Sequence, residues 1–174
     1  MNAVKILLEG WGNNFLITFV SMIFPLLIGL AAYLLTKYFP ILGKVFHWLS
    51  LPFECLCPVV LLLVYFFVVF PEMNATILVI IVMSLCYLGY MPARFNSDFS
   101  FLKNFLYHGL GLFSSIYKWS FCVGYVGTMD LLRASNMLRN NSYEPGWVLI
   151  ALFGSLAVLL VAELGKRLIH QFMK

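Results

Sequence analysis

The feature that most constrains this chain is a long apolar run near its N-terminus. From Phe15 to Tyr38 the only charged residue is Lys37. A helix needs about 20 residues to cross the hydrocarbon core of a bilayer, so this run is long enough to span it. Hydrophobic residues make up 63% of the chain and charged residues 10%, whereas soluble domains carry about 25% charged residues. We therefore expect an all-α integral membrane protein, which excludes nucleic-acid readout, soluble metabolic chemistry and a disordered scaffold as its main role.

Hydropathy divides the chain into five predicted transmembrane helices, which form a single transmembrane domain over residues 1–174. The predicted spans cover approximately residues 15–38, 53–70, 75–90, 99–117 and 147–164. A short amphipathic stretch separates the first two spans, and a turn at 71–74 separates the next two. The segment before the last span is too polar to face lipid, and we expect it to contain a short helix around 130–138.

The distribution of basic residues predicts the orientation of these spans. Cytoplasmic loops of membrane proteins carry an excess of Lys and Arg. If the N-terminus is outside, the inner side holds seven basic residues (Lys37, Lys44, Arg94, Lys103, Lys166, Arg167 and Lys174) and the outer side holds three (Lys5, Arg133 and Arg139). We therefore expect the N-terminus outside and the C-terminus in the cytoplasm.

Residue patterns that carry catalytic or metal chemistry are absent from the sequence. The four cysteines lie in or beside apolar runs, without His or acidic residues at the spacing of a zinc site. The sequence has no Gly-rich phosphate loop, no paired-histidine zinc motif and no serine nucleophile elbow. We expect a chain that is not an enzyme and that holds no catalytic residue, cofactor or metal of its own.

Three stretches together resemble the membrane permease subunit of bacterial ABC importers for polar amino acids. The first is LLEGWGNNFLITFVSMIFPLLIGLAAYLLTKY, in which Leu-Glu-Gly precedes a helix that contains threonine. The second is PFECLCPVVLLLVYFFVVFP, in which a Phe-Glu pair and a proline lead into an aromatic helix. The third is FSSIYKWSFCVGYVGTMDLLRASNML, which is followed by a final apolar helix and a basic tail. The resemblance covers the whole chain and rests on the order of these stretches rather than on one motif.

This resemblance implies a location and a set of partners. The chain would be a multi-pass protein of the bacterial cytoplasmic (inner) membrane, surrounded by membrane lipid. It would pair with a second permease subunit, like or unlike itself, and with cytoplasmic ABC ATPases that bind the ATP and Mg. An extracytoplasmic substrate-binding protein would deliver an amino acid or a similar small polar solute. No nucleic acid is involved.

The sequence also departs from the family in the cytoplasmic loop that contacts the ATPase. Tyr90 and Lys118 are only 28 positions apart, which is too short for both the full loop and the fourth span. The remaining candidate coupling loop comprises Pro92, Ala93, Arg94, Phe95, Asn96, Ser97 and Asp98. We therefore expect the divergent half of a heterodimer, whose partner carries the complete loop.

Glu54, Lys118 and His108 are the candidate path or subunit-contact residues, because ionisable groups within membrane segments are costly and often functional. Each has a second interpretation. Lys118 can extend to the outer interface. Glu54 can stabilise the start of a helix. His108 can be a hydrogen-bonded packing residue rather than a proton relay. Glu163 and Lys166 are spaced for an ion pair within one helix.

A second hypothesis places the chain in another functional class. The shortened loop and the small number of polar groups within the spans also fit a permease-derived membrane scaffold or regulatory subunit that does not itself transport. A small secondary transporter or channel fits less well, because the five spans show no inverted repeat.

Overall fold

The computed structural model describes residues 3–54, 57–69, 72–91, 101–121, 123–142 and 146–173. Every regular element in these ranges is a helix, and none of them contains a strand. The elements are α1 (Ala3–Tyr38), α2 (Pro40–Glu54), α3 (Pro58–Val64), the π-helix η1 (Tyr65–Val69), α4 (Ala75–Cys86), α6 (Phe101–Ser120), the 3₁₀-helix η2 (Val123–Val126), α7 (Leu131–Ser142) and α8 (Gly146–Met173). The predicted all-α class is confirmed.

The longest helix, α1, has 36 residues, which corresponds to about 54 Å at a rise of 1.5 Å per residue. Its buried face is made of small and polar residues as well as apolar ones, among them Gly10, Asn14, Thr18 and Ser21. Its exposed face instead carries large apolar side chains such as Phe24. Helices that pack in a membrane place small residues at their contacts, so this distribution indicates that α1 faces lipid.

Two helices, α1 and α8, are long and apolar enough to cross a membrane. Both are longer than predicted, since α1 begins twelve residues before Phe15 and α8 extends past Leu164 to Met173. The mostly exposed apolar surface of α8 again indicates contact with lipid. The five-span arrangement beyond these two helices stays a prediction.

The second and third predicted spans differ most from the helices in the structure. The predicted helix at 53–70 is interrupted, because α2 ends at Glu54 and α3 begins at Pro58. Proline favours the first turn of a helix, where its missing N–H is not needed. The third predicted span is helical from Ala75 only to Cys86. At twelve residues, α4 is about 18 Å long, shorter than a hydrocarbon core of about 30 Å.

The remaining predictions of local structure agree better with the structure. The amphipathic stretch after the first span is the helix α2, and the fourth predicted span corresponds to α6. The short helix expected around 130–138 is α7. The turn before α4 ends at Asn74, whose side chain accepts a hydrogen bond from the Thr76 N–H at 2.9 Å and so caps the helix.

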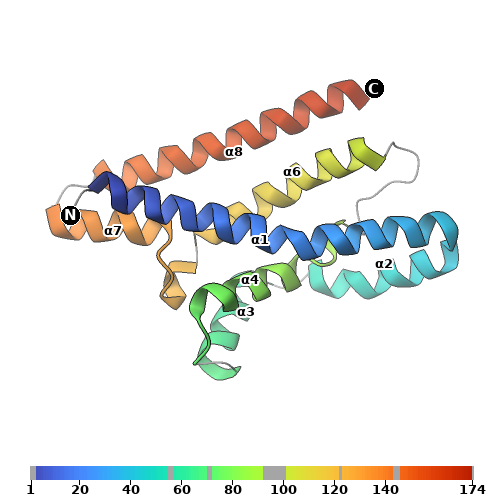
Figure 1. Ribbon diagram of the computed structural model, residues 1–174, viewed down its shortest axis with the longest axis horizontal. Coiled ribbons are helices and arrows are strands. Elements are labelled where there is room, and N and C mark those ends of the chain that lie inside the picture. The colour runs from blue at the N-terminus through green and yellow to red at the C-terminus, as the bar shows by residue number, and fades with distance from the viewer. Residues whose placement is uncertain are drawn as a thin grey trace.

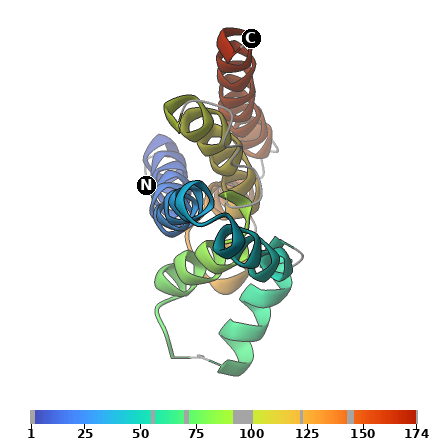
Figure 2. The same cartoon turned by 90° about the vertical axis from the view of Figure 1, so that its right-hand side faces the viewer.

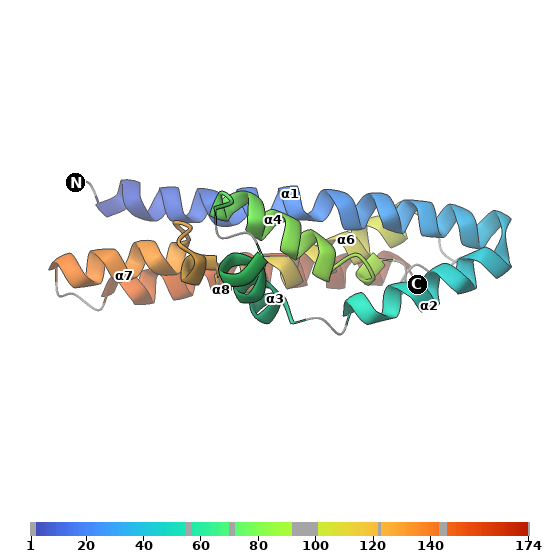
Figure 3. The same cartoon turned by 90° about the horizontal axis from the view of Figure 1, so that it is seen from below.

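Most of the helices, among them α1, α2, α6 and α8, lie roughly along one long axis, whereas α3 runs across it (Figure 1). The two termini lie at opposite ends of this axis, because α1 and α8 run the same way and α6 runs back between them (Figures 1 and 3). Viewed end-on, α8 and α3 occupy opposite extremes, with α1 and α6 between them (Figure 2). An odd number of membrane crossings would require the two termini to lie at opposite ends.

Two apolar clusters form the core. The larger one joins α1, α4 and α6 around Ile17, Val82 and Ile116. The smaller one joins α1, α7 and α8 around Leu7, Leu131 and Ala151.

Polar side chains reinforce the contact between α1 and α4. Ser84 Oγ donates a hydrogen bond to the Ser21 carbonyl at 3.2 Å, and Ser21 Oγ donates to the Ile80 carbonyl at 3.5 Å. Both serines are buried. Hydrogen bonds of this kind hold helices together in a bilayer, where apolar burial provides little driving force.

Candidate functional site

The segment between α6 and α7 folds into a tight turn whose shape depends on glycine. η2 occupies Val123–Val126, and Gly127 follows with φ of 94°. This left-handed backbone conformation is readily adopted by glycine and rarely by other residues. Thr128 Oγ1 donates a hydrogen bond to the Val123 carbonyl at 2.7 Å and closes the turn. The turn therefore holds one defined conformation over a few residues.

Asp130 ties this turn to α7. Its side chain is fully buried. One carboxylate oxygen accepts a hydrogen bond from the Arg133 N–H at 2.6 Å, as an N-cap residue does, and the other accepts from the Gly124 N–H at 2.9 Å. A Cβ at Gly124 would lie 2.8 Å from Asp130 Oδ1. Only glycine therefore allows the carboxylate to approach the turn so closely.

Burial and hydrogen bonding act in opposite directions on this carboxyl group. Burial raises the pKa of Asp130, because removing a carboxylate from water disfavours its charged form. The backbone N–H groups of Arg133 and Gly124 and the charge of Arg133 lower the pKa by smaller amounts. The net shift is upward, so the fold holds the proton of Asp130 more tightly than water does.

The N-terminal half of α1 supplies the other side of the same polar cluster. Asn13 Nδ2 donates a hydrogen bond to the Met129 carbonyl at 2.9 Å. Asn14 Oδ1 accepts from the Leu131 N–H at 3.3 Å, while Asn14 Nδ2 is buried without a hydrogen-bond partner in the described part of the chain. A Cβ at Gly10 would lie 2.8 Å from the Asp130 carbonyl oxygen. α1 and the start of α7 are thus in direct backbone contact.

A polar cavity lies beside this cluster, and we call it the α7 pocket. Its volume is about 510 Å³, within the range of ligand sites. The residues that line it are Phe121, Gly124, Gly127, Asp130, Leu132, Arg133, Asn136, Met137 and Asn140. Arg133 Nη1 donates hydrogen bonds to the carbonyls of Gly127 and Thr128, which holds the guanidinium against the turn. Asp130 and Arg133 are the charged residues of this lining, so its formal charge sums to zero.

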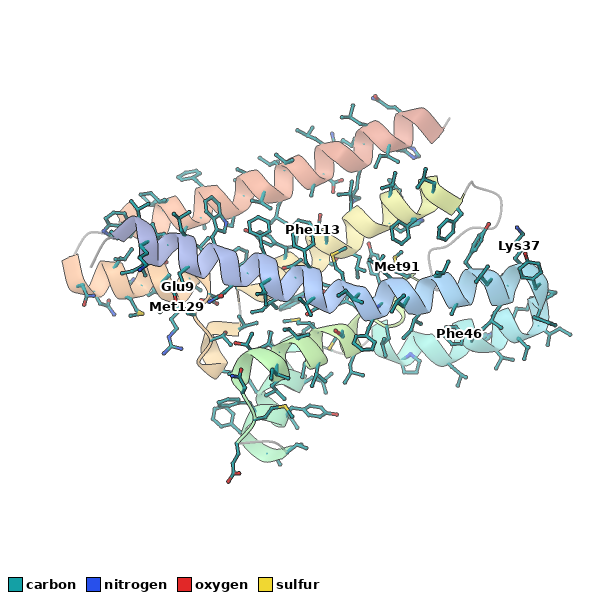
Figure 4. All side chains as sticks on the ribbon, in the orientation of Figure 1. Glu9, Lys37, Phe46, Met91, Phe113 and Met129 are labelled. Carbon is teal, nitrogen blue, oxygen red and sulfur yellow. The ribbon has the colours of Figure 1, made fainter. Side chains whose placement is uncertain are left out.

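A second cavity, which we call the apolar groove, runs between α1, α6 and α8. Its volume is about 770 Å³. One wall is aromatic and includes Phe15, Phe19 and Phe113, and the α8 wall carries small residues such as Gly154 and Gly165. Phe113 lies in the space between α1 and α8 (Figure 4). The described lining contains no charged residue, and the indole N–H of Trp11 already donates to Tyr117, so the groove offers little to a polar solute.

The structure does not bring the sequence-predicted site residues together. The candidate coupling loop at 92–98 lies outside the described residues. Glu54 is the last residue of α2, and its side chain also lies outside the described part. His108 and Lys118 are both on α6, ten residues or about 15 Å apart along its axis. A joint role of these residues therefore stays a prediction.

Lys118 and His108 are the two predicted site residues whose side chains are described, and they lie in different environments. Lys118 is exposed near the end of α6. His108 is half-buried, and its ring centroid lies 5.1 Å from that of Tyr107 in an edge-to-face arrangement. The predicted ion pair within α8 is present, with Lys166 Nζ 2.7 Å from Glu163 Oε2. Within the described ranges, no three His, Cys, Asp or Glu side chains gather as metal ligands would.

The sequence prediction of the site missed the α7 pocket. Asp130 stood at the predicted start of a short helix, which is the usual place for a capping residue. Nothing in the sequence indicated that Gly124 would approach its carboxylate, or that Gly10 and Asn14 of the distant helix α1 would contact the backbone beside it. The pair Asn13-Asn14 at the start of an apolar run was the available signal, because polar residues there need hydrogen-bond partners.

Comparison with known proteins gives a match by fold and none by sequence. No protein family matches the chain, and no curated protein matches its sequence. A solved structure described as "Crystal structure of an amino acid ABC transporter with histidines" matches with a TM-score of 0.72 and 14% sequence identity, over 94% of this chain and 94% of that chain. At this identity the similarity shows a shared fold. Together with α1 and α8, it indicates a membrane protein.

Proposed function

We propose that this chain is the transmembrane subunit of an ABC importer complex for amino acids or similar small polar solutes. The observation that carries the proposal is the fold similarity to an amino acid ABC transporter over nearly the whole chain. The three sequence stretches that resemble polar amino-acid permeases support it independently, because that resemblance does not depend on the fold.

The proposed topology has five membrane crossings, with the N-terminus outside and the C-terminus in the cytoplasm of a bacterial cell. In this arrangement α1, α6 and α8 are three of the crossings. α2 returns toward the N-terminal end, α3 with η1 runs across the long axis, and α4 runs back again. The opposite directions of α1 and α2, and of α6 and α8, support the arrangement (Figures 1 and 3). The α7 pocket then lies at the outer end of the molecule.

The proposed complex contains a second permease subunit, two cytoplasmic ABC ATPases and an extracytoplasmic substrate-binding protein. The chain itself is not an enzyme in this proposal, and ATP and Mg bind to the ATPases. The short interval between Tyr90 and Lys118 supports a heterodimer in which the other permease subunit makes most of the ATPase contact.

One observation favours the second candidate function, a membrane scaffold or regulatory subunit derived from a permease. The apolar groove, which lies among the proposed crossings, has an almost wholly apolar described lining, and the N–H of Trp11 there is already bonded to Tyr117. A non-transporting subunit needs no polar path.

Affinity capture of the tagged full-length chain from its own membranes tests the proposal. The chain is extracted in a mild detergent, and the captured proteins are identified by mass spectrometry. We expect an ABC ATPase and a second permease subunit with a full coupling loop. Reconstituted in liposomes, this complex should hydrolyse ATP faster when the binding protein and its solute are added. Capture of an unrelated enzyme without an ATPase contradicts the importer and supports the scaffold.

A further inference from the structure

Arg133 is held in the α7 pocket with most of its hydrogen-bonding capacity unused. Its Nη1 donates to two carbonyls of the turn, whereas Nε and Nη2 donate to no other group in the described part of the chain. An arginine guanidinium presents five N–H donors in a rigid fork that matches the two oxygens of a carboxylate. The side chain is exposed, so a ligand in the pocket can reach it.

From this arrangement we propose that the α7 pocket is a binding site for a zwitterionic amino acid, whose carboxylate pairs with the guanidinium of Arg133. The identity of the ligand class rests on the proposed importer function. The site itself rests on the cavity, on the fixed arginine and on the polar residues around it.

The charge pattern of the pocket favours a zwitterion over a simple anion. Asp130 lies at the base of the pocket and balances the charge of Arg133. Because Asp130 is fully buried, it acts on the ligand through its electric field rather than by direct contact. Opposite charges at one site attract the two ends of a dipolar ligand. A ligand with a carboxylate alone would be attracted by Arg133 and, when Asp130 is ionised, repelled by Asp130.

The remaining lining residues divide into a polar and an apolar part. Asn136 and Asn140 are four residues apart on α7, so their side chains lie on one face of the helix. Their amides can bind the ammonium group through oxygen or the carboxylate through nitrogen. Phe121, Leu132 and Met137 form the apolar part, which can receive the ligand's side chain.

A carboxylate can reach Arg133 from a second source. An acidic side chain of a protein that docks on the outer end presents the same group. The two sources differ in one respect, because a docking side chain carries no ammonium group beside its carboxylate. Ligands that contain one group or both therefore distinguish them.

The test measures binding by isothermal titration calorimetry to the purified full-length chain in lipid nanodiscs, without an ATPase. The probes are leucine, glutamine and arginine, together with leucinamide, which lacks the carboxylate of leucine, and 4-methylpentanoate, which lacks its ammonium group. We expect at least one amino acid to bind and both truncated probes to bind at least tenfold more weakly. Arg133→Gln should weaken amino-acid binding at least tenfold. Arg139→Gln, on the same helix but outside the pocket lining, should leave it unchanged.

Four outcomes overturn the inference. They are the absence of amino-acid binding up to millimolar concentration, equal binding of leucinamide, equal effects of the two arginine substitutions, and binding of 4-methylpentanoate in preference to amino acids. The last outcome assigns the pocket to an acidic side chain of a docking protein. Equal melting temperatures of the two variants ensure that loss of binding is not loss of fold. The binding measurement contains no ATPase, so it does not depend on whether the affinity capture recovers one. A failed binding measurement likewise leaves the affinity capture as a separate test of the importer.

Discussion

The α7 pocket and the apolar groove are both cavities beside α1, but they are built in different ways. The α7 pocket is bounded by a turn and a helix start whose backbone groups are held by hydrogen bonds to Asp130 and Arg133. The groove is bounded by aromatic rings on one side and small residues on the other. Hydrogen bonds fix directions as well as distances, whereas apolar contacts fix little more than volume. The pocket is therefore expected to keep one shape, and the groove to adjust to whatever apolar group fills it.

The contact between α1 and α7 at the base of the pocket should be the most sensitive to substitution. Gly10→Ala places a Cβ 2.8 Å from the Asp130 carbonyl and 2.9 Å from Ala134 Cβ. Because both neighbours belong to the packed start of α7, we expect a loss of about 1–3 kcal/mol in the free energy of unfolding. The measurement is an unfolding titration in mixed detergent micelles, followed by tryptophan fluorescence.

Gly12→Ala is the matched control on the same helix, since a Cβ there meets nothing within 4 Å. Replacement of a helical glycine by alanine should then stabilise the chain by up to about 1 kcal/mol. Equal effects of the two substitutions would show that α1 and α7 do not touch at Gly10.

The buried carboxyl group of Asp130 should make stability depend on pH. Its folded-state pKa is raised by burial, so the folded state binds the proton more tightly than the unfolded state. The contribution of Asp130 to stability is then complete below about pH 4 and is lost as the pH rises through the folded-state pKa. We expect the melting temperature of the wild type to fall with rising pH relative to that of Asp130→Asn. Parallel curves for the two proteins would contradict the raised pKa.

The hydrogen bond between Trp11 and Tyr117 joins α1 and α6 near the end of the groove. Trp11 Nε1 donates to Tyr117 Oη at 2.9 Å, and Tyr117 is fully buried. Tyr117→Phe removes the acceptor and leaves the indole N–H without it, so we expect a loss of about 1 kcal/mol and a shift of the tryptophan emission. Tyr107→Phe, on the same helix and less buried, serves as the control and should change neither quantity.

The smallest effect is expected at the ion pair on α8. Lys166 and Glu163 are 2.7 Å apart, with side chains 22% and 47% exposed. Exposed pairs at this helical spacing contribute about 0.2–0.5 kcal/mol. Lys166→Ala should therefore lower the free energy of unfolding by no more than this. A loss comparable to that of Gly10→Ala would mean that Lys166 has a further role.

Hydropathy predicts a helix well when the length and composition of its own segment are sufficient to make it helical. α1 and α8 were predicted because each carries a long apolar run that needs little help from other residues, whereas the run of α6 is interrupted by Lys103 and His108. The helix α7 was predicted from its polar composition and from the aspartate before it. The break between Glu54 and Pro58 was missed, because an apolar run can continue through the sequence while its backbone changes direction.

The candidate site was harder to predict than the fold for a physical reason. The predicted residues were ionisable groups within apolar runs, since charge is visible in a sequence. The α7 pocket instead depends on where small residues allow close approach, as Gly10 and Gly124 do. Close approach is a property of two segments together, and Asn14 and Leu131 are 117 positions apart. A single sequence does not record which segments meet.

The unbroken length of α1 has a mechanical consequence. The helix is roughly 24 Å longer than a hydrocarbon core of about 30 Å, so part of it stands outside the lipid even when it is tilted. Gly10 and Asn14 contact the α7 segment near one end, and Lys37 lies at the other (Figure 4). A rod of this kind transmits a rotation from end to end, with Pro25 the one proline within it where a kink can absorb part of the motion. The helix can thus act as a lever, in which a small displacement beside the α7 segment moves the end that carries Lys37.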